Sequence, residues 1–217
     1  MEKLNIINES QLGGSPSSPD RMKMYKDIFW EEPWKEWFVC QSCWKILPKC
    51  FWWRCECWSW SNFEPFYNNK GLKEEFQSLS KKPGYSELIA EILGEKIWFI
   101  WWWSTDIDSL NEDKLKLDYE QLTDLILILM DMFPDFDTDS FYYLAEIWVR
   151  KDYRDKDIAG SLYREIINNL KENQEKYVLA RTTRKSNKPY KRFLKEWFRE
   201  VFSYDDQQDR VILVLKL

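Results

Sequence analysis

The pattern of hydrophobic and polar positions predicts strands and helices along most of this chain. Short runs rich in β-branched, aliphatic and aromatic residues, bounded by turn residues, are typical of strands. Such runs occur at 3–8, on both sides of a turn at Gly94-Glu95, at 141–150, at 176–182, and twice near the C-terminus, where the last run is VILVLKL.

Helices are expected between these strands. Hydrophobic residues recur every four positions at Ile158, Leu162, Ile166 and Leu170, which places them on one buried face of a helix. The remaining pattern predicts further helices at about 21–29, 70–79, 118–133 and 188–196. A meander of strands is thus followed by alternating strands and helices. This order indicates an α+β fold with a mixed, mostly antiparallel sheet flanked by helices.

Length and charge narrow the class of protein. The 217 residues suffice for a single domain, 1–217, with its own core. The net charge of −5 argues against a nucleic-acid partner, because nucleic-acid binders usually carry a basic excess. The longest apolar run, LILILM at 125–130, is far too short to span a bilayer, and the start, MEKLNIINESQL, does not resemble a signal peptide. We therefore expect a cytoplasmic protein with no membrane partner, either a monomer or a homodimer.

Acidic residues gather in one segment. Residues 104–140 contain eleven acidic residues and two lysines, and we expect them to form an acidic helical insert. Such a segment attracts cationic molecules. A solvated acidic face explains the same composition, and the sequence leaves both readings open.

The chain contains no histidine, which removes the most common general base and the most common nitrogen ligand for metals. Any proton transfer must therefore use Glu, Asp, Tyr, Cys, Lys or water.

The segment EIWVRKDYRDKDIAGSLYREII, residues 146–167, predicts a strand, a short loop and a helix that starts at 157–161. Backbone amides at a helix start bind anions, assisted by the helix dipole. The segment resembles the acetyl-CoA signature of the GNAT acyltransferases, R/Q-x-x-G-x-G/A after the fourth strand. Arg154 matches the first position of this signature and Ala159 the last, while Asp157 stands where the family has its middle glycine.

The resemblance extends over about residues 86–217. YVLARTTRKSNKPYKRFLKEWF, residues 177–198, resembles the family's fifth strand and the loop and helix that end in a Gly-Phe pair. It implies an N-acetyltransferase, a bacterial GNAT member, that uses acetyl-CoA as cosubstrate. It also implies a set of coenzyme-binding residues: Ile147, Trp148, Val149, Arg154, Lys156, Asp157, Ile158, Ala159, Gly160, Ser161 and Asn187.

The resemblance also assigns catalytic candidates. In this family the amine attacks the thioester directly, so the protein supplies mainly positioning and a base. Glu146 is the candidate base, with a structural carboxylate at a strand end as the alternative. The family's tyrosine acid corresponds to Phe193 here, so Tyr190, one helical turn earlier, is the candidate acid.

Charged residues near the signature modify this expectation. The Asp157 carboxylate would repel a diphosphate unless it turns outward or caps the helix. A run of basic residues could offset this repulsion by binding the coenzyme phosphates. The alternative is that the run is a solvated helix face. The run consists of Arg181, Arg184, Lys185, Lys188, Lys191, Arg192, Lys195 and Arg199.

Tryptophan is abundant where glycine is scarce. The chain has fourteen Trp and six Gly, whereas average usage of roughly 7% predicts about fifteen Gly. Several tryptophans stand where the resemblance has glycine, among them Trp30, Trp37, Trp44, Trp98, Trp148 and Trp197. We predict that some of their codons are UGA, which certain bacterial lineages read as glycine. Within IWFIWWWS, Trp98 and Trp102 are the expected glycines; a protein unusually rich in aromatic residues is the alternative.

All five cysteines lie between 40 and 57, in CQSCWKILPKCFWWRCEC. Clustered thiols in a cytosolic chain favour a structural zinc ion over disulfides, and four cysteines satisfy tetrahedral Zn²⁺. We predict a zinc-knuckle insert at 38–60 with Cys40, Cys43, Cys55 and Cys57 as ligands. Cys50 competes for a place in the second pair, and free thiols or a redox pair remain alternatives.

The sequence therefore predicts an N-acetyltransferase that acts on an amine, either a small molecule or a protein. The alternative is a catalytically impaired protein of the same fold that senses CoA or binds a partner. Asp157 and Phe193 are the residues that favour this alternative.

Overall fold

The structure is a computed structural model that describes residues 4–8, 23, 38–40, 46–47, 63–65, 69–154, 156–185, 187–204 and 209–217. The chain divides into two compact units. The first, which we call the sheet unit, contains Met1–Leu12 and Lys82–Leu217, and the second contains Gly13–Lys81.

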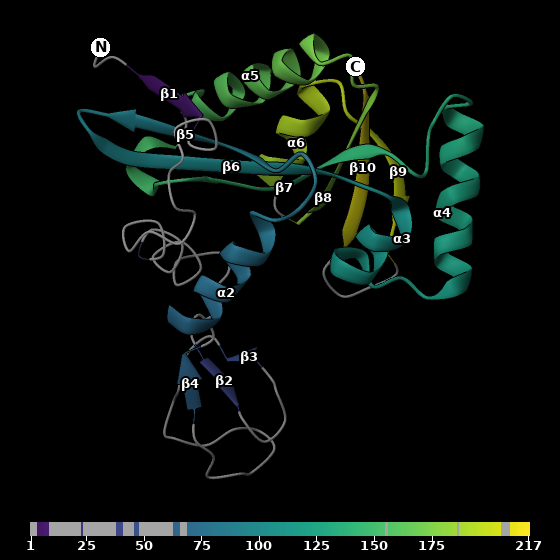
Figure 1. Ribbon diagram of the computed structural model, residues 1–217, viewed down its shortest axis with the longest axis horizontal. Helices are drawn as coiled ribbons and strands as arrows, with labels where there is room; N and C mark the ends of the chain where they lie inside the picture. Colours follow the sequence, from purple (N-terminus) through teal and green to yellow (C-terminus); the bar gives the residue numbers. More distant parts are fainter. Residues whose placement is uncertain are drawn as a thin grey trace. The chain divides into compact units, whose positions relative to one another are not determined.

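The sheet unit is built on seven strands in the order β1-β5-β6-β7-β8-β10-β9 (Figure 1). Neighbouring strands are antiparallel except β7 and β8, which are parallel. This arrangement confirms the mixed, mostly antiparallel sheet predicted from the sequence. The strands are β1 (Asn5–Asn8), β5 (Ser86–Ile92), β6 (Glu95–Thr105), β7 (Phe141–Val149), β8 (Tyr177–Thr183), β9 (Arg199–Ser203) and β10 (Arg210–Lys216).

The hairpin between β5 and β6 turns one residue earlier than predicted. Ile92 pairs with Glu95, so the turn is Leu93-Gly94 rather than Gly94-Glu95. Both turn residues have positive φ, 54° and 80°. Two-residue turns with positive φ at both positions match the right-handed twist of the flanking strands. The twist of the hairpin therefore favours a turn with positive φ at both positions, although leucine occupies the first of them.

Helices α5 (Ile158–Glu172) and α6 (Asn187–Lys195) pack on one face of the sheet. The four-residue spacing predicted the buried face of α5 correctly. Every residue of that stripe is buried in one cluster with residues of β5, β6, β7, β8 and β10: Ile158, Leu162, Ile166 and Leu170.

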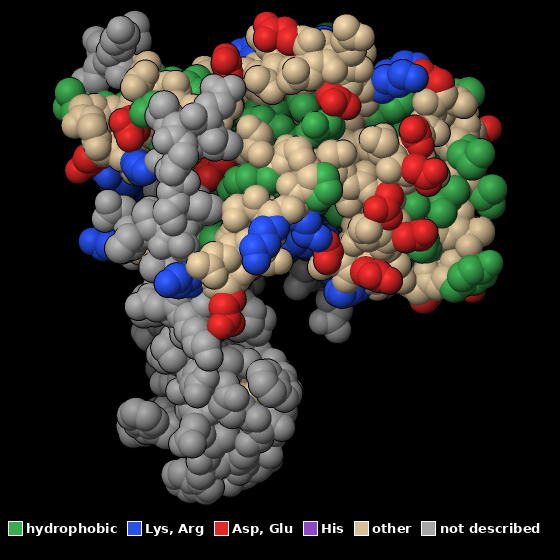
Figure 2. Space-filling model, viewed as in Figure 1, with side chains coloured by type: hydrophobic (Ala, Val, Ile, Leu, Met, Phe, Trp, Pro, Cys, Tyr) green, Lys and Arg blue, Asp and Glu red, His purple; other side chains and the backbone are tan. Residues whose placement is uncertain are grey.

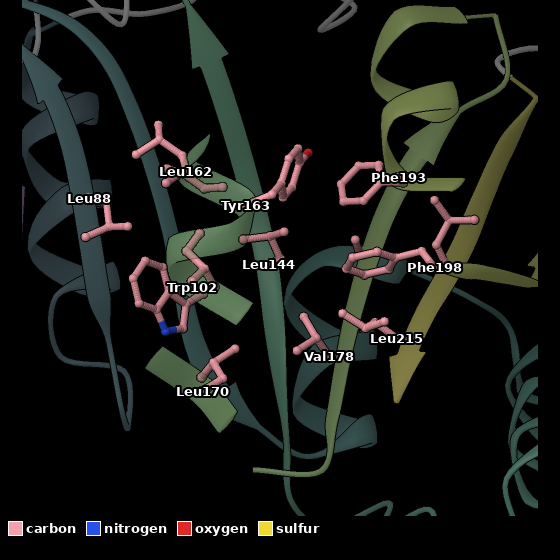
Figure 3. Packing of buried hydrophobic residues seen from close by; sticks show 14 of the residues in the cluster. Leu88, Trp102, Leu144, Leu162, Tyr163, Leu170, Val178, Phe193, Phe198 and Leu215 are labelled. Atoms are coloured by element: carbon pink, nitrogen blue, oxygen red, sulfur yellow. The ribbon is translucent and has the colours of Figure 1, made fainter. Parts of the chain in front are cut away.

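Trp102 of β6 is one of the largest side chains in this core. Its indole lies between Leu88 of β5 and Leu144 of β7, and it is 1% exposed (Figure 3). Trp102 is not among the described residues with positive φ. A glycine here would leave a large cavity, which in other cores costs several kcal/mol. The fold therefore gives no support to glycine at position 102.

The acidic segment packs against the opposite face of the sheet. It folds into α3 (Ile107–Leu110), a π-helical turn η1 (Asn111–Leu115) and α4 (Tyr119–Met132), which agrees with the helix predicted at 118–133. Asp118 and Gln121 form a capping box at the start of α4, so the boundary follows from local hydrogen bonds. Figure 2 shows acidic and hydrophobic side chains side by side over this segment. Leu127 and Met130 of α4 are exposed.

Aromatic contacts and one carboxylate attach this segment to the sheet. The rings of Phe133 and Phe136 lie 5.6 and 5.0 Å from that of Tyr177, the first residue of β8. The Tyr177 hydroxyl donates to Asp135 at 2.5 Å, and the Lys216 ammonium of β10 lies 2.6 Å from the same carboxylate. Asp135 therefore connects the end of the acidic segment to two strands.

No helix in the described parts of the chain is long and apolar enough to cross a membrane.

In the second unit, a three-stranded sheet has the order β3-β2-β4, formed by β2 (Phe38–Cys40), β3 (Ile46–Leu47) and β4 (Phe63–Pro65). Helix α2 (Asn69–Leu79) follows, close to the prediction of 70–79. Of the helix predicted at 21–29, the structure describes only Lys23, which is helical. The insert predicted at 38–60 lies inside this unit.

The carboxylate of Asp135 generates a prediction about pH. Hydrogen bonds from Lys216 and then Tyr177 lower the pKa of Asp135 from 3.8 to about 2. A group whose pKa is depressed in the folded state stabilises the fold above its unfolded pKa, and this contribution is lost as pH falls through the folded pKa. We expect wild type to lose stability between about pH 4 and pH 2 more steeply than Asp135→Asn. Urea unfolding across this range measures the difference.

Lys216→Met serves as the matched variant, because it removes the first partner of Asp135 and leaves the carboxylate. It should flatten the pH dependence in the same direction. Identical pH slopes for wild type and both variants would show that the cluster does not hold the carboxylate in its charged form.

Candidate active site

Strands β7 and β8 part in the middle of the sheet. Their parallel ladder consists of three pairs, from Tyr142↔Val178 to Leu144↔Ala180. Beyond this point β7 continues to Val149 along β6, and β8 continues to Thr183 along β10. Of the strands that the structure describes, none pairs with β7 on this side beyond Leu144. The sheet therefore opens between 145–149 and 181–183.

A β-bulge marks the place where the strands part. Leu144 pairs with Trp102 and Glu146 pairs with Trp101, so Ala145 is an extra residue on β7. Bulges bend a strand and often lie next to active sites. The bulge explains why β7 leaves β8 here, and it puts Glu146, the predicted base, at the opening; the position of its side chain lies outside what the structure describes.

A second carboxylate lies in the same row of the sheet. Glu87 of β5 pairs with Trp101, which pairs on its other side with Glu146. Glu87 is 2% exposed, the only charged residue buried among those described, and accepts a hydrogen bond from the Tyr85 hydroxyl at 3.0 Å. Sequence reasoning missed Glu87. Its only signal was an acidic residue directly before the apolar run Leu88-Ile89-Ala90 of β5.

Helix α5 starts directly after the loop that follows β7. Its first intrahelical bond runs from Ser161 N–H to Asp157 C=O at 3.1 Å, so the amides of residues 158–160 precede the helical ladder. Asp157 has φ 53° and makes no side-chain hydrogen bond to these amides. Of the two alternatives considered for Asp157, that it turns outward or that it caps the helix, the structure contradicts the cap. Its left-handed backbone is the conformation that glycine adopts most easily, which fits the glycine of the resembling signature.

The Asp157 carboxylate instead pairs with two arginines. Arg164 of α5 donates to it at 3.1 Å, and Arg192 of α6 donates to its other oxygen. Arg192 also donates to Glu196 at 3.2 Å, and Arg164 lies 3.7 Å from the same carboxylate. The hydrogen bonds from Arg164 and then Arg192 lower the pKa of Asp157 below its usual value. We call these four residues the arginine cluster.

Gly160 leaves the space that this cluster occupies. A Cβ built on Gly160 would lie 2.7 Å from Arg192 Nη1, 2.8 Å from Asp157 Oδ1 and 3.0 Å from Arg164 Nη1. A side chain at position 160 would require the Arg192 and Asp157 side chains to shift and would crowd Arg164. The start of α5 is therefore shaped so that charged groups approach its backbone closely.

Tyr190, the predicted acid, lies away from the opening. Its hydroxyl donates to Glu200 of β9 at 2.7 Å, and this bond is the main cause that raises the pKa of Tyr190. β9 is the outer neighbour of β10, which itself lies beyond β8. Arg184 also donates to Glu200 and binds Asp209 at 2.7 Å, so the tyrosine belongs to a charged network at this edge.

Phe193, which the resemblance aligns with a tyrosine, is buried in the core. Its ring lies 5.1 Å from that of Tyr163 and 4.9 Å from that of Phe198. It is 4% exposed. The position therefore contributes to packing between α5, α6 and the turn that follows α6.

Trp197 ends α6 in a left-handed turn. The Phe198 N–H bonds the Phe193 carbonyl at 3.1 Å and the Trp197 N–H bonds the Leu194 carbonyl at 3.3 Å, which together form a Schellman motif. Trp197 has φ 70° and is 83% exposed. Glycine is the usual residue at this position of the motif. The prediction that Trp197 occupies a glycine position is thus supported by its backbone.

The other predicted binding residues fall around the opening and the start of α5. Ile147 and Val149 continue β7 past the bulge, and the Arg154 Nε donates to the Val149 carbonyl at 3.1 Å. Lys156 is exposed, with its ammonium 4.6 Å from the Tyr153 ring centre. The first turn of α5 contains Ile158, Ala159, Gly160 and Ser161. Trp148 and Asn187 lie in β7 and at the start of α6, and the positions of their side chains lie outside what the structure describes, as for Trp98.

The predicted zinc site cannot be located in the same way. Cys40 is buried on β2, while Cys43, Cys50, Cys55 and Cys57 lie outside the described residues, as do Trp30, Trp37 and Trp44. Within the described ranges, no group of three or more His, Cys, Asp or Glu residues is placed to hold a metal ion.

No protein-family model matches the chain, and no curated protein matches it in sequence. Solved structures do resemble it. NAA60 of Arabidopsis thaliana, in complex with acetyl-CoA, is 13% identical with a TM-score of 0.54, and the match covers 99% of each chain. A putative acetyltransferase of the GNAT family from Desulfovibrio desulfuricans is 10% identical with a TM-score of 0.55, again over 99% of each chain. An uncharacterized protein from Bacillus halodurans is 12% identical with a TM-score of 0.55, over 99% of this chain and 84% of that one.

These likenesses establish the fold. The chain has the fold of the GNAT acetyltransferases, as the signature around Arg154 and Ala159 implied. The parting of β7 and β8 and the helix start after β7 are the two features of that fold on which a function can be built.

The turn at Trp197 generates a prediction about stability. A non-glycine residue in the left-handed region costs roughly 1–2 kcal/mol. Since the indole is 83% exposed, its removal loses little buried area. We expect Trp197→Gly to raise the free energy of unfolding by about 1 kcal/mol. Equilibrium urea unfolding measures this change.

Trp197→Ala is the control, because it removes the indole and keeps a Cβ at positive φ. It should leave the stability within about 0.5 kcal/mol of wild type. Equal stabilisation by both variants would mean that the ring, and not the backbone conformation, is responsible.

Proposed function

We propose that this protein is an N-acetyltransferase that uses acetyl-CoA and acts on an amine. The observation that carries the proposal is the opening between β7 and β8 next to the start of α5. The NAA60 structure, which shares the fold, holds acetyl-CoA. The proposal places the coenzyme of this chain in the opening between β7 and β8.

The residues present fit a coenzyme of this kind. Beyond Leu144, β7 presents peptide groups along one edge with no strand partner among those described, and a pantetheine arm carries amides that can pair with such an edge. At the end of this edge lie the amides of residues 158–160 and the Arg164 and Arg192 guanidinium groups. Guanidinium groups and helix starts both bind phosphates. The coenzyme supplies an activated acetyl thioester.

The chain itself would position the two reactants and accept a proton. An ordered edge that fixes the thioester beside the bulge reduces the entropy cost of bringing the amine to it. Glu146, at the bulge, is proposed to take a proton from the attacking ammonium group. Since the chain has no histidine, a carboxylate at this place is the base that the structure offers.

Release of free thiol from acetyl-CoA in the presence of a panel of amines tests this function. We expect thiol release with at least one amine. Glu146→Gln should lower kcat by about a hundredfold, because a positioned base contributes roughly 10²–10⁴. The KM for acetyl-CoA should stay within about threefold, since backbone groups and arginines hold the coenzyme.

Two variants sharpen this experiment. Glu91→Gln removes a carboxylate of β5 outside the Glu87 row and should leave kcat unchanged. Tyr190→Phe should also preserve kcat within about twofold, because its hydroxyl is bonded to Glu200 on β9. A large loss of kcat in Tyr190→Phe would restore the tyrosine as the acid. If Glu91→Gln abolished thiol release and Glu146→Gln did not, Glu146 would be excluded as the base.

The second candidate is a module that binds CoA without transfer. Two observations favour it: Asp157 brings a carboxylate to the start of α5, and Phe193 fills the family's tyrosine position with a core ring. Saturable binding of acetyl-CoA without thiol release, over a broad panel of amines, would establish this function instead.

We further propose that the cysteine segment holds one structural zinc ion through Cys40, Cys43 and the Cys55–Cys57 pair, with Cys50 as the competing ligand. The ligand chemistry supports this, since four thiolates complete a tetrahedral site. Metal analysis of purified protein should find about one zinc per chain, lost in Cys43→Ser. Full zinc content in that variant would contradict the assignment.

We also propose that the protein is bacterial and that the codon for Trp197 is UGA. The gene sequence decides both.

A further inference from the structure

The Asp157 carboxylate occupies the position at the start of α5 where an anion would be favoured. One of its oxygens lies 2.8 Å from where a Cβ of Gly160 would stand. The other accepts from Arg164 at 3.1 Å, and Arg192 completes the pairing. A carboxylate is a small anion, so this side chain makes the same class of contact with the arginines that a phosphate oxygen would make.

Both arginines have a second acidic partner besides Asp157. Glu196, whose side chain is 12% exposed, accepts from Arg192 at 3.2 Å and lies 3.7 Å from Arg164. Arg192 is itself only 21% exposed. Because Glu196 pairs with both guanidinium groups, each arginine keeps an acidic partner when the Asp157 contact is broken. Its side chain is also the most exposed of the four, at 54%.

The cluster carries two positive and two negative charges, so its side chains offer an incoming diphosphate no net charge. Removal of the Asp157 charge would leave one positive charge in excess beside the helix start. The backbone geometry adds to this: Asp157 is held in the left-handed region by the turn into α5, which aims its side chain at the arginines.

We propose that Asp157 is an autoinhibitory residue, an internal anion that binds Arg164 and Arg192 and must be displaced before a coenzyme's diphosphate can reach them. This inference rests on the proposed function. When a diphosphate binds, the Asp157 carboxylate swings into solvent, and Arg192 changes partner from the carboxylate to a phosphate oxygen. The affinity for the coenzyme is therefore set by competition between two anions for the same arginines.

Calorimetric titration of CoA into wild type and Asp157→Asn tests the proposal. Asparagine keeps the size of the side chain and tolerates positive φ, but it loses the charge. We expect Asp157→Asn to bind CoA about tenfold more tightly than wild type, the scale expected when a close like charge is removed from a partly exposed site. Asp152→Asn is the matched control: Asp152 is an exposed acid in the preceding loop that pairs with Arg150 at 3.6 Å, and its removal should change affinity by less than about twofold.

The chemistry of the ligand localises the effect. Dephospho-CoA retains the diphosphate and should show the same gain in Asp157→Asn as CoA does. A gain seen with CoA but absent with dephospho-CoA would overturn the proposal, because it would place Asp157 at the 3′-phosphate.

A double-mutant cycle with Arg192→Gln tests the change of partner. Since Arg192 in wild type must first leave Asp157, its removal should weaken CoA binding more in the Asp157→Asn background than in wild type. Lys195→Gln, on the same helix, controls for the lost charge and should show no such difference. Equal effects in both backgrounds would overturn the competition.

Failure of the inference and failure of the proposed function give different results. If wild type and Asp157→Asn bind CoA with equal affinity, the autoinhibitory role is overturned and coenzyme binding stands. If neither protein binds CoA at millimolar concentration, the proposed function itself is overturned.

Discussion

The parting of β7 and β8 is the constraint on which the remaining structure depends. One extra residue, Ala145, bends β7 away after the Leu144↔Ala180 pair. Neither strand loses its outer neighbour, because β6 continues to pair with β7 and β10 with β8. The opening therefore costs only the inner ladder bonds. It also sets where the chain after β7 must turn, and hence where α5 begins.

Two left-handed residues determine the geometry of the charged groups near this opening. Asp157 starts α5 at φ 53°, and Trp197 follows α6 at φ 70°. Glu196, which holds both arginines of the cluster, immediately precedes Trp197. A change in the turn at Trp197 would therefore move Glu196, and with it Arg192. The strained residue Trp197 is thus one peptide away from Glu196, which contacts the arginines where we place the coenzyme phosphates.

Sequence reasoning reached the features that depend on local patterns. The α5 stripe and the capped start of α4 follow from spacing within one helix, and the signature from Arg154 to Ala159 indicated the fold. It did not reach contacts between distant positions. Arg192 lies 35 residues from Asp157 along the chain, and no sequence pattern predicts the contact between them. It also did not indicate that Trp102 faces the core, because a codon argument carries no information about which strand positions are buried.

The acidic segment, residues 104–140, also has a structural role that its composition did not predict. Arg181 is the first residue of β8 beyond the last pair with β7, and it donates to the Lys114 carbonyl in η1. Tyr177, the first residue of β8, donates to Asp135 at the other end of the segment. The segment thus holds β8 on both sides of the point where its inner neighbour leaves. A strand that loses one partner needs support from elsewhere if the opening is to keep its shape. The contacts with Arg181 and Tyr177 thus give the segment a structural role that does not depend on its net charge.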